Sequence, residues 1–477
     1  METLVDPSLE TVLVKAFHQQ KSRIKDLRSE PIKNRIQRLR NLRDWIQSNR
    51  AKLHDAMHAD FKKHPVEVDG IEIFHVLSEI KNAISNLEVW ASAKKVDAPI
   101  TMLGTKSFIQ HEPRGVCLIL SPWNYPFSLC VGPLVSALAA GNAVILKPSE
   151  FTPHVSAVLK RMVGEVFEPS VVSIFEGGAE VSQLLLKLPF DHIFFTGSPS
   201  VGKIVMKAAA ENLTSVTLEL GGKSPSIITG SASLKDAAKR TAVAKFVNNG
   251  QTCVAPDYVL VDEKIADRFS TLLMQQIKAL FTENNESFEH SEHYCRIVND
   301  KHFLRLRTLL QETVEEGAKI IFGGDANKDT RFIHPTVISH VPPTSRIMKE
   351  EIFGPILPII VFKRLEEAIA LINEKPKPLA LYIFSRNKKE QQQILRETSS
   401  GGVCINDSGI HFLHHNLPFG GVNHSGIGKS HGYYGFLTFS NEKPVLKQRA
   451  GLTSVSAFYP PYTTRSKKLM DWFLKFF

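Results

Sequence analysis

The sequence predicts an α/β fold with a parallel, doubly wound sheet followed by a second α/β unit. From Gly115 onward, short apolar segments such as GVCLIL and HIFFTG alternate with helical segments such as VGKIVMKAAA, and repeated βα units of this kind form parallel sheets. A second alternating series has strands near 258–261, 356–362 and 381–384. The chain of 477 residues is also too long for one ordinary core, so two or three domains are expected.

The first 113 residues precede the alternating pattern and are expected to form helices followed by a hairpin. Residues 8–93 have helical periodicity and many Arg, Lys and Glu side chains, which predicts long surface helices. Residues 98–112 change to strand-forming residues interrupted by Leu103-Gly104-Thr105, which predicts a β-hairpin that projects as an arm.

Composition excludes several classes of protein. The 43% hydrophobic and 22% charged residues are typical of an ordered globular protein. The formal charge of +10 is spread along the chain without a recognised nucleic-acid-binding module, so no nucleic-acid partner is expected. Five dispersed cysteines without CxxC spacing indicate a reducing compartment, and no run of 18 apolar residues predicts a membrane-spanning helix.

The segment FTGSPSVGK places Gly197 and Gly202 between a strand and a helix, where glycines let a pyrophosphate approach the helix N-terminus. Two ordinary turn glycines are the alternative, since the segment lacks the full GxGxxG pattern. A Walker A motif is excluded because Ile204 stands where Ser or Thr would bind magnesium.

Two polar residues lie at or near strand ends. Glu219 stands among leucines in TLELGGKSP, where burial would raise its pKa towards the range of a general base; the alternative is a carboxylate on the polar face of a half-buried strand. Asn124 in SPWNYP follows the GVCLIL strand and could donate to an oxyanion, or it could serve only the turn.

Cys253 lies in the loop NNGQTCVAPD. A helix over about 234–246 is expected to end at Asn248-Asn249-Gly250, and Pro256 prevents it from resuming. The thiol is therefore expected in a loop between elements, where it could act as a nucleophile if its surroundings favour the thiolate.

Two other features are weaker. The histidines at 411, 414 and 415, and those at 290 and 293 with Cys295, lack the spacing expected of a zinc site, so no metal is predicted. Near the C-terminus, one helical face is apolar and could contact the protein body, a partner subunit, the substrate entrance or a membrane surface; it comprises Leu469, Trp472, Phe473, Phe476 and Phe477.

Seven motifs together resemble the aldehyde dehydrogenase superfamily, in the family's order and over the chain as far as Tyr462. They are PWNYP at Pro122, GNAVILKPSE at Gly141, FTGSPSVGK at Phe195, LELGGKSP at Leu218, NNGQTCVAPDY at Asn248, EEIFGP at Glu350 and LPFGGVNHSGIG at Leu417. The wording of several segments, including PWNYPF, GQTCVAPDY and YPPY, is most similar to the class 3, fatty-aldehyde-dehydrogenase-like branch.

The resemblance assigns expected roles to individual residues. It implies that Cys253 is the nucleophile, Glu219 the general base and Asn124 the oxyanion-hole amide. It also implies a set of cofactor-binding residues: Trp123, Lys147, Glu150, Gly197, Ser198, Val201, Gly202, Glu351 and Phe353. The cofactor implied is NAD, with NADP possible.

The resemblance further implies a Rossmann-type cofactor domain, a catalytic domain and a small bridging or oligomerisation sheet. The expected divisions are 1–95 with 114–219 for the cofactor domain, 220–428 for the catalytic domain, 96–113 with 429–450 for the bridging elements, and 451–477 for the C-terminal tail. The loop 410–416 is expected to line the substrate passage.

The implied activity is NAD(P)-dependent oxidation of medium- or long-chain aliphatic or aromatic aldehydes to carboxylic acids. A thiohemiacetal and then a thioester would form on Cys253, and Glu219 would activate the hydrolytic water. The alternatives are a catalytically silent structural or NAD-binding protein on the same fold, and an enzyme that transfers the acyl group to coenzyme A. We expect a cytoplasmic homodimer, soluble or in peripheral membrane contact through the C-terminal helix.

Overall fold

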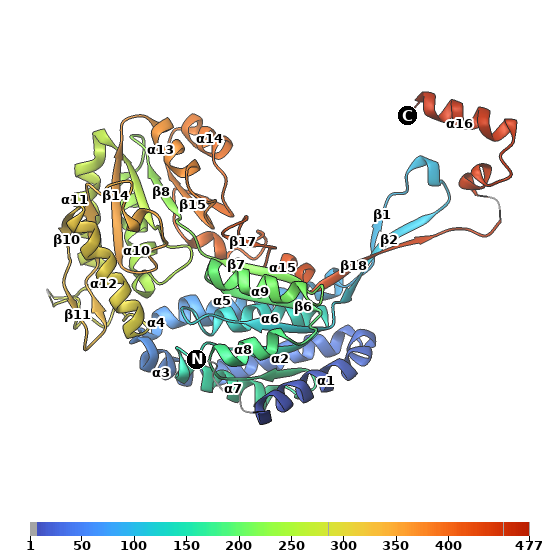
Figure 1. Ribbon diagram of the computed structural model, residues 1–477, viewed down its shortest axis with the longest axis horizontal. Helices are drawn as coiled ribbons and strands as arrows, with labels where there is room; N and C mark the ends of the chain where they lie inside the picture. The colour runs from blue at the N-terminus through green and yellow to red at the C-terminus, as the bar shows by residue number, and fades with distance from the viewer. Residues whose placement is uncertain (1–6, 285, 452, 477) are drawn as a thin grey trace.

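The computed structural model describes residues 7–284, 286–451 and 453–476. The chain forms two α/β layers, each consisting of one sheet and the helices that cover it, and a thin arm that ends in the C-terminal helix (Figure 1). Among the described residues, no helix is both long and apolar enough to cross a membrane.

The first sheet has six strands in the order β17-β7-β6-β3-β4-β5, all parallel except β17. Its strands are β3 (Val116–Leu120), β4 (Ala143–Lys147), β5 (Val172–Ile174), β6 (His192–Gly197), β7 (Ser215–Leu220) and β17 (Gly426–Ile427). The central strands β3 and β4 are buried throughout, which explains their continuous apolar runs.

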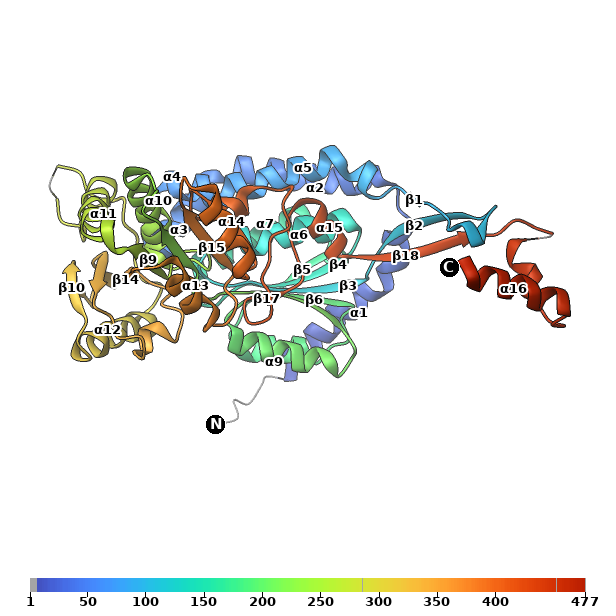
Figure 2. The same cartoon turned by 90° about the horizontal axis from the view of Figure 1, so that it is seen from above.

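Helices cover both faces of this sheet (Figure 2). Alternate residues of β3 point to opposite faces, so Cys117 and Ile119 join one apolar core and Val116 and Leu118 another. The first core contains α2 (Ile32–Ser48), α3 (Arg50–Phe61), α5 (Phe74–Trp90), α6 (Ser128–Ala140) and α7 (Pro153–Val166). The second contains α1 (Pro7–Ser29), α8 (Ala179–Leu186) and α9 (Pro199–Ala210). The doubly wound sheet predicted from the sequence is confirmed.

The second sheet has seven strands in the order β10-β13-β14-β9-β8-β15-β16, with β10 alone antiparallel to its neighbour. The strands are β8 (Pro225–Ile228), β9 (Tyr258–Asp262), β10 (Lys319–Phe322), β13 (Thr336–Ser339), β14 (Ile356–Phe362), β15 (Ala380–Phe384) and β16 (Gly402–Ile405). One face packs on α10 (Leu234–Phe246) and α11 (Ala266–Phe281), and the other on α12 (Asp300–Glu315), α13 (Leu365–Asn373) and α14 (Lys388–Glu397).

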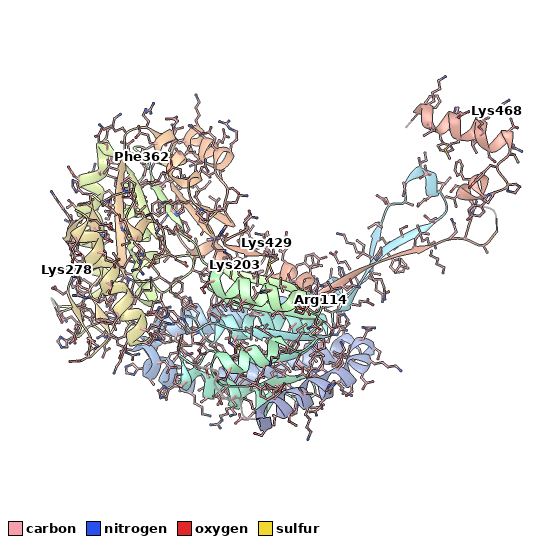
Figure 3. The ribbon with its side chains drawn as sticks, viewed as in Figure 1. Arg114, Lys203, Lys278, Phe362, Lys429 and Lys468 are labelled. Atoms are coloured by element: carbon pink, nitrogen blue, oxygen red, sulfur yellow. The ribbon has the colours of Figure 1, made fainter. Side chains whose placement is uncertain are left out.

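The arm is an antiparallel three-stranded sheet of β1 (Lys94–Val96), β2 (Lys106–Pro113) and β18 (Ser440–Lys447). The hairpin expected at 98–112 is therefore present, with its first strand a few residues earlier. Arg114 lies where the arm leaves the body (Figure 3), and its guanidinium donates to the Thr438 carbonyl at 2.7 Å and to the Ser215 hydroxyl at 3.2 Å.

The chain crosses back to the first sheet before it enters β18. Strand β17 pairs with β7, and α15 (Gly432–Thr438) contacts α5 and α6. The first part of the segment 429–450, expected as a bridge, thus packs on the first layer. The division into the four domain segments remains our proposal, and this return of the chain is what brings residues near 430 to Glu219 on β7.

Candidate active site

The loop that carries Cys253 begins with three left-handed residues. Helix α10 ends at Phe246, and Asn248, Asn249 and Gly250 have φ angles of 53°, 56° and 70°. A Cβ on Gly250 would lie 2.4 Å from the Gly354 carbonyl oxygen, so only glycine fits this turn without a backbone shift. The helix end predicted from the sequence is confirmed, and the turn directs the loop back between the two sheets.

Buried amides hold the loop in place. The Gln251 side chain donates to the carbonyls of Asn248 and Arg296, each at 3.0 Å, and accepts from the Val298 amide at 3.0 Å. Tyr382 donates from its hydroxyl to the Val254 carbonyl. Cys253 is thus positioned by fixed neighbours on both sides.

Burial raises the pKa of the Cys253 thiol to about 12, and the carboxyls of Glu351 and Glu219 act in the same direction. The backbone amides of Cys253 and Val254 interact with the sulfur and act in the opposite direction. In the free protein the group is therefore a neutral thiol near pH 7. The sequence could not show this, and it means that the thiol must lose its proton as it reacts.

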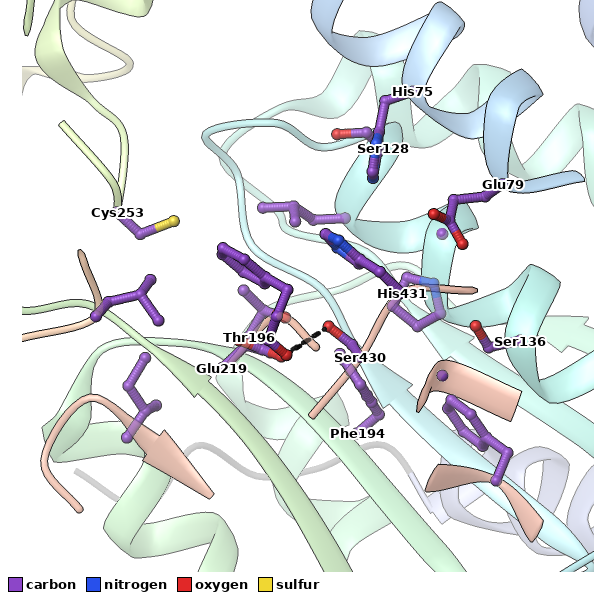
Figure 4. A pocket seen from close by; sticks show the side chains of 18 residues that line it. His75, Glu79, Ser128, Ser136, Phe194, Thr196, Glu219, Cys253, Ser430 and His431 are labelled. Atoms are coloured by element: carbon purple, nitrogen blue, oxygen red, sulfur yellow. Dashed lines mark hydrogen bonds between the residues drawn. The ribbon is translucent and has the colours of Figure 1, made fainter. Parts of the chain in front are cut away.

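Glu219 is buried on β7 with 7% of its surface exposed, so the alternative of a solvated carboxylate does not apply. One carboxylate oxygen accepts from the Ser430 hydroxyl at 2.8 Å (Figure 4). The other is buried without a hydrogen-bond partner in the described structure. Burial raises the pKa of Glu219 to about 8, while Ser430 and Lys429 lower it less, which suits a general base near neutral pH.

Asn124 is 3% exposed in the turn after β3. Its side-chain amide donates one hydrogen to the Gln251 carbonyl at 3.0 Å, and its backbone carbonyl accepts from the Lys63 ammonium at 3.1 Å and the Asn248 amide at 2.8 Å. An amide carries two hydrogens, so one is left for a ligand. Asn124 and Cys253 line the same pocket, as an oxyanion hole requires.

A pocket of about 430 Å³ runs from the start of α9 to Cys253. We call it the cofactor pocket. Its wall contains Pro122, Trp123, Asn124, Thr196, Gly197, Ser198, Glu219, Cys253, His302, Glu351 and Phe353. In this wall, side-chain polar atoms of Thr196, Glu219 and His302 are buried and unpaired in the described structure.

The start of α9 fits a dinucleotide phosphate. Ser198 caps the helix by accepting from the Val201 amide at 3.4 Å, and its carbonyl accepts from the Gly202 amide at 2.9 Å. Since Pro199 has no N–H, the Ser200 N–H is the first-turn group left for a ligand. A Cβ on Gly202 would lie 2.9 Å from the Leu220 side chain, so this glycine lets α9 approach β7 closely. With the unpaired polar atoms of the wall, this cradle fits the cofactor that the motifs indicate.

The structure brings five of the nine expected cofactor residues into the pocket wall: Trp123, Gly197, Ser198, Glu351 and Phe353. Trp123 and Phe353 make an edge-to-face contact with ring centroids 5.4 Å apart. The other four, Lys147, Glu150, Val201 and Gly202, lie outside this wall, although Lys147 ends β4 beside β3 and donates to Glu150 at 3.0 Å.

A second opening, which we call the apolar cavity, also reaches Cys253. Its volume is about 200 Å³. Apolar side chains dominate its wall, among them Ile71, Leu129, Val243, Val247, Ile410, Phe412 and Leu413. Three residues of the loop 410–416, expected to line the substrate passage, are thus in this wall.

Sequence reasoning missed several polar residues around the centre. His75 and Glu79 come from α5, and Ser430 and His431 precede α15, yet all four line a small inner cavity with Glu219 and Cys253 (Figure 4). Tyr125 and Thr252 pair their hydroxyls at 2.8 Å beside the nucleophile loop. No short-range sequence pattern predicts such residues, because they are far apart in the chain and come together only in the folded structure.

Comparisons with known proteins identify the family of this chain. Residues 9–445 match the model of the aldehyde dehydrogenase family. The chain is 44% identical to a 4,4'-diaponeurosporen-aldehyde dehydrogenase of Staphylococcus aureus (strain NCTC 8325 / PS 47), over 97% of this chain and 99% of that protein. It is 43% identical to aldehyde dehydrogenase family 3 member A2 of Mus musculus, over 94% of this chain and 91% of that protein.

Among solved structures, the substrate-bound state of Staphylococcus aureus AldH matches with a TM-score of 0.92 and 43% identity, covering 97% of this chain and 99% of that one. The chain therefore belongs to the aldehyde dehydrogenase family, and its relatives include family 3 members. The resemblance inferred from the seven motifs is confirmed.

Proposed function

We propose that this enzyme oxidises apolar aldehydes to carboxylic acids with NAD(P), through an acyl group held on Cys253. One observation carries this proposal: Cys253 lines both the cofactor pocket and the apolar cavity, whose walls, among the described residues, otherwise share only Leu129. An aldehyde carbonyl at the end of the apolar cavity would lie between the thiol and the hydride acceptor, as the reaction requires.

Cys253 performs the first step. Its sulfur attacks the aldehyde carbon, the carbonyl π bond opens towards oxygen, and the thiol proton passes to a water molecule in the pocket as the carbon–sulfur bond forms. A thiohemiacetal results. The oxygen of that intermediate develops negative charge, which the free hydrogen of the Asn124 amide and the Cys253 backbone N–H would stabilise. Bound in the cofactor pocket, NAD(P) would supply the hydride acceptor for this oxidation, and loss of hydride from the thiohemiacetal carbon would leave a thioester on Cys253.

Glu219 completes the turnover. Its ionised carboxylate removes a proton from a water molecule, the water oxygen bonds to the thioester carbon, and the carbon–sulfur bond breaks. The released Cys253 thiolate takes the proton of the carboxylic acid, so the product leaves as a carboxylate, the thiol is regenerated, and the proton removed from water stays on Glu219. A buried base beside the nucleophile supports hydrolysis over transfer to coenzyme A, because the transfer needs no water-activating carboxylate.

The residues that would hold NAD(P) follow from the wall of the cofactor pocket. The first turn of α9 would receive the pyrophosphate, and Glu351 would accept from ribose hydroxyls. Burial and then Asp257 raise the pKa of Glu351 to about 8. Glu150 near the end of β4 would repel a 2′-phosphate and favours NAD; comparing kcat/KM for NAD and NADP tests this preference.

The apolar cavity supports medium- and long-chain aldehydes as substrates. Each methylene that enters it gains about 0.8 kcal/mol, so kcat/KM is expected to rise about fourfold per carbon from acetaldehyde towards decanal until the cavity is filled. NADH formation across an aldehyde series measures this. A flat profile, or one that falls with chain length, would contradict the assignment of this cavity.

A substitution at the mouth of the apolar cavity sharpens the test. Val243→Trp places a large ring where α10 borders the cavity, and it is expected to reduce decanal oxidation by at least about tenfold while acetaldehyde oxidation stays within about twofold. Leu395→Trp on the exposed face of α14 is the matched control. Equal losses for both aldehydes would show that Val243 does not border the substrate path.

We also infer a homodimer formed through the arm. The three-stranded sheet has β1 and β18 at its two edges, and β18 is the longer with 8 residues. A long unpaired edge is a ready site for another strand. The arm leaves the body and is therefore accessible to a second copy (Figure 1). Light scattering should give twice the chain mass of 53.3 kDa, and a monomer at micromolar concentration would contradict it.

Peripheral membrane contact through the C-terminal helix is the second proposed association. In α16 (Thr464–Phe476), Trp472, Leu474 and Phe476 are exposed among several lysines, which suits an anionic interface. The expected apolar residue Phe477 lies outside the described residues. Co-sedimentation with vesicles containing phosphatidylserine tests this, and the proposal fails if a chain with Trp472, Leu474 and Phe476 changed to serine sediments equally.

A further inference from the structure

The inner cavity on the far side of Glu219 has no role in the proposed acyl-transfer steps. Cys253 and Glu219 form one part of its wall, and His75 and Glu79 of α5, Ser136 of α6, and Ser430 and His431 form another (Figure 4). The volume of this cavity is about 40 Å³. Since one water needs roughly 10 to 15 Å³ by this measure, the cavity can hold two or three.

A second buried carboxyl borders this cavity. Glu79 is 4% exposed, and one of its oxygens accepts from the Gly432 backbone amide at 2.8 Å. No lysine, arginine or histidine forms an ion pair with it in the part of the chain that the structure describes. Buried carboxyls usually have a charged partner, so this one stands out.

One short segment connects the two carboxyls. The Ser430 hydroxyl donates to Glu219 and, two residues later, the Gly432 amide donates to Glu79. Between them His431 has a φ angle of 72° and a buried ring nitrogen without a hydrogen-bond partner in the described structure. Its ring centroid is 5.0 Å from that of His75, so polar groups continue from one carboxyl to the other.

The reaction requires a path for protons at this place. Each hydrolysis leaves on Glu219 the proton it removed from water, and Glu219 cannot act again until that proton has left. Glu219 is buried, and substrate and cofactor would fill the two larger openings beside it. The inner cavity is a third opening at this centre, which neither substrate nor cofactor would fill.

We propose that Glu79 is the proton acceptor for Glu219, with water in the inner cavity carrying the proton between them. The inference rests on the proposed role of Glu219 as the base. In this step the O–H bond of protonated Glu219 breaks, water molecules pass a proton along, and an O–H bond forms on Glu79. No electrons are transferred, Glu219 becomes ionised again, and Glu79 later releases the proton to solvent.

The titratable groups that face the cavity are suited to this transfer. Burial raises the pKa of Glu219 to about 8 and that of Glu79 to about 7, so the proton is shared between groups of similar affinity. Burial lowers the pKa of His75 to about 4 and that of His431 well below its usual value, so both imidazoles stay neutral and do not trap the transferred proton. Lys429 faces Glu219 and Cys253 is a neutral thiol.

Glu79→Gln tests the proposal because glutamine keeps the shape and the acceptor for Gly432 but cannot take up a proton. The steady-state kcat is expected to fall on the order of tenfold, less than the roughly 10² to 10⁴ of a direct base. The rate and size of the first burst of NADH should not change. The dependence of kcat on pH should also lose the ionisation near 7, and formate should restore part of the rate. Glu88→Gln, an exposed position on the same helix, is the matched control.

A second pair of variants tests the water without touching either carboxyl. Gly132 of α6 lines the cavity, and an added Cβ would meet no atom within 4 Å. Gly132→Val would displace water and is expected to reduce kcat to a similar degree as Glu79→Gln, whereas Gly132→Ala, which also adds a Cβ at this position but fills less space, should have a smaller effect.

The outcomes separate this inference from the proposed function. If Glu79→Gln and Gly132→Val both fold and both keep the wild-type kcat and pH profile, the relay is wrong while the role of Glu219 stands. If Glu79→Gln slows the burst and steady state equally, or raises KM for NAD, Glu79 only anchors α15, and the relay is again wrong. If wild type forms no NADH with any aldehyde of the series, under either NAD or NADP, the proposed function itself fails.

Discussion

Replacing Cys253 with alanine is expected to abolish aldehyde oxidation, with kcat/KM reduced by at least about 10⁴-fold. The thiol is the group at the junction of the cofactor pocket and the apolar cavity that can bond to an aldehyde carbon. Without that bond the carbonyl carbon carries no sulfur substituent, no thiohemiacetal forms, and hydride departure is unfavourable. NADH absorbance with purified variant and decanal measures the loss.

The control for this result must separate chemistry from folding. Cys404 of β16 is half-buried like Cys253, but it does not line either opening, so Cys404→Ala should keep kcat/KM within about threefold. Both variants should bind NAD with unchanged affinity in a fluorescence titration. A Cys253→Ala protein that still turns over aldehyde at the wild-type rate would refute the acyl-enzyme mechanism.

Glu219→Gln is expected to block the second half of the reaction and spare the first. Steady-state kcat should fall by about 10² to 10⁴, the usual contribution of a general base. Hydride transfer precedes water activation, so a burst of about one NADH per active site should remain. Stopped-flow absorbance at high NAD and decanal separates the two phases. A variant without a burst would show that Glu219 acts before hydride transfer, which is incompatible with a base that serves hydrolysis alone.

The pH dependence of wild type follows from the same carboxyl. Burial raises the pKa of Glu219 to about 8, and only its ionised form accepts a proton from water. Where hydrolysis limits the rate, kcat should therefore increase about tenfold per pH unit well below pH 8 and level off above it. Rapid-quench measurement of thioester decay in wild type should give this profile, and a pH-independent decay would contradict it.

Much of the fold could be predicted from local pattern. Strand and helix alternation after Gly115 predicted the doubly wound sheet, because each βα unit is specified by its own apolar period. The end of α10 at Phe246 was predictable for the same reason, since the Asn-Asn-Gly turn is a local signal. The return of the chain through β17 and α15 was not, because antiparallel pairing of β17 with β7 joins segments about 200 residues apart.

The sequence predicted which residue types come together in the candidate site, but it did not predict the electrostatics of that site. The motif that contains Cys253 indicates its place in a loop, but the rise in its pKa depends on burial between two layers and on Glu351. Glu79 belongs to no recognisable sequence motif. Its place near Glu219 depends on the contact between α5 and the start of α15, which the sequence does not show. Gly202 was assigned to the cofactor, whereas the structure shows that it also allows contact between α9 and Leu220.

The central claim is that the substrate becomes an acyl group on the Cys253 sulfur. Its most direct test is mass spectrometry of Glu219→Gln protein quenched in acid after mixing with decanal and NAD. We predict that the peptide containing Cys253 gains the mass of a decanoyl group, that the gain requires NAD, and that it is absent from Cys253→Ala. NADH formation in a burst with no acyl group on Cys253, or with the acyl group on another residue, would contradict it.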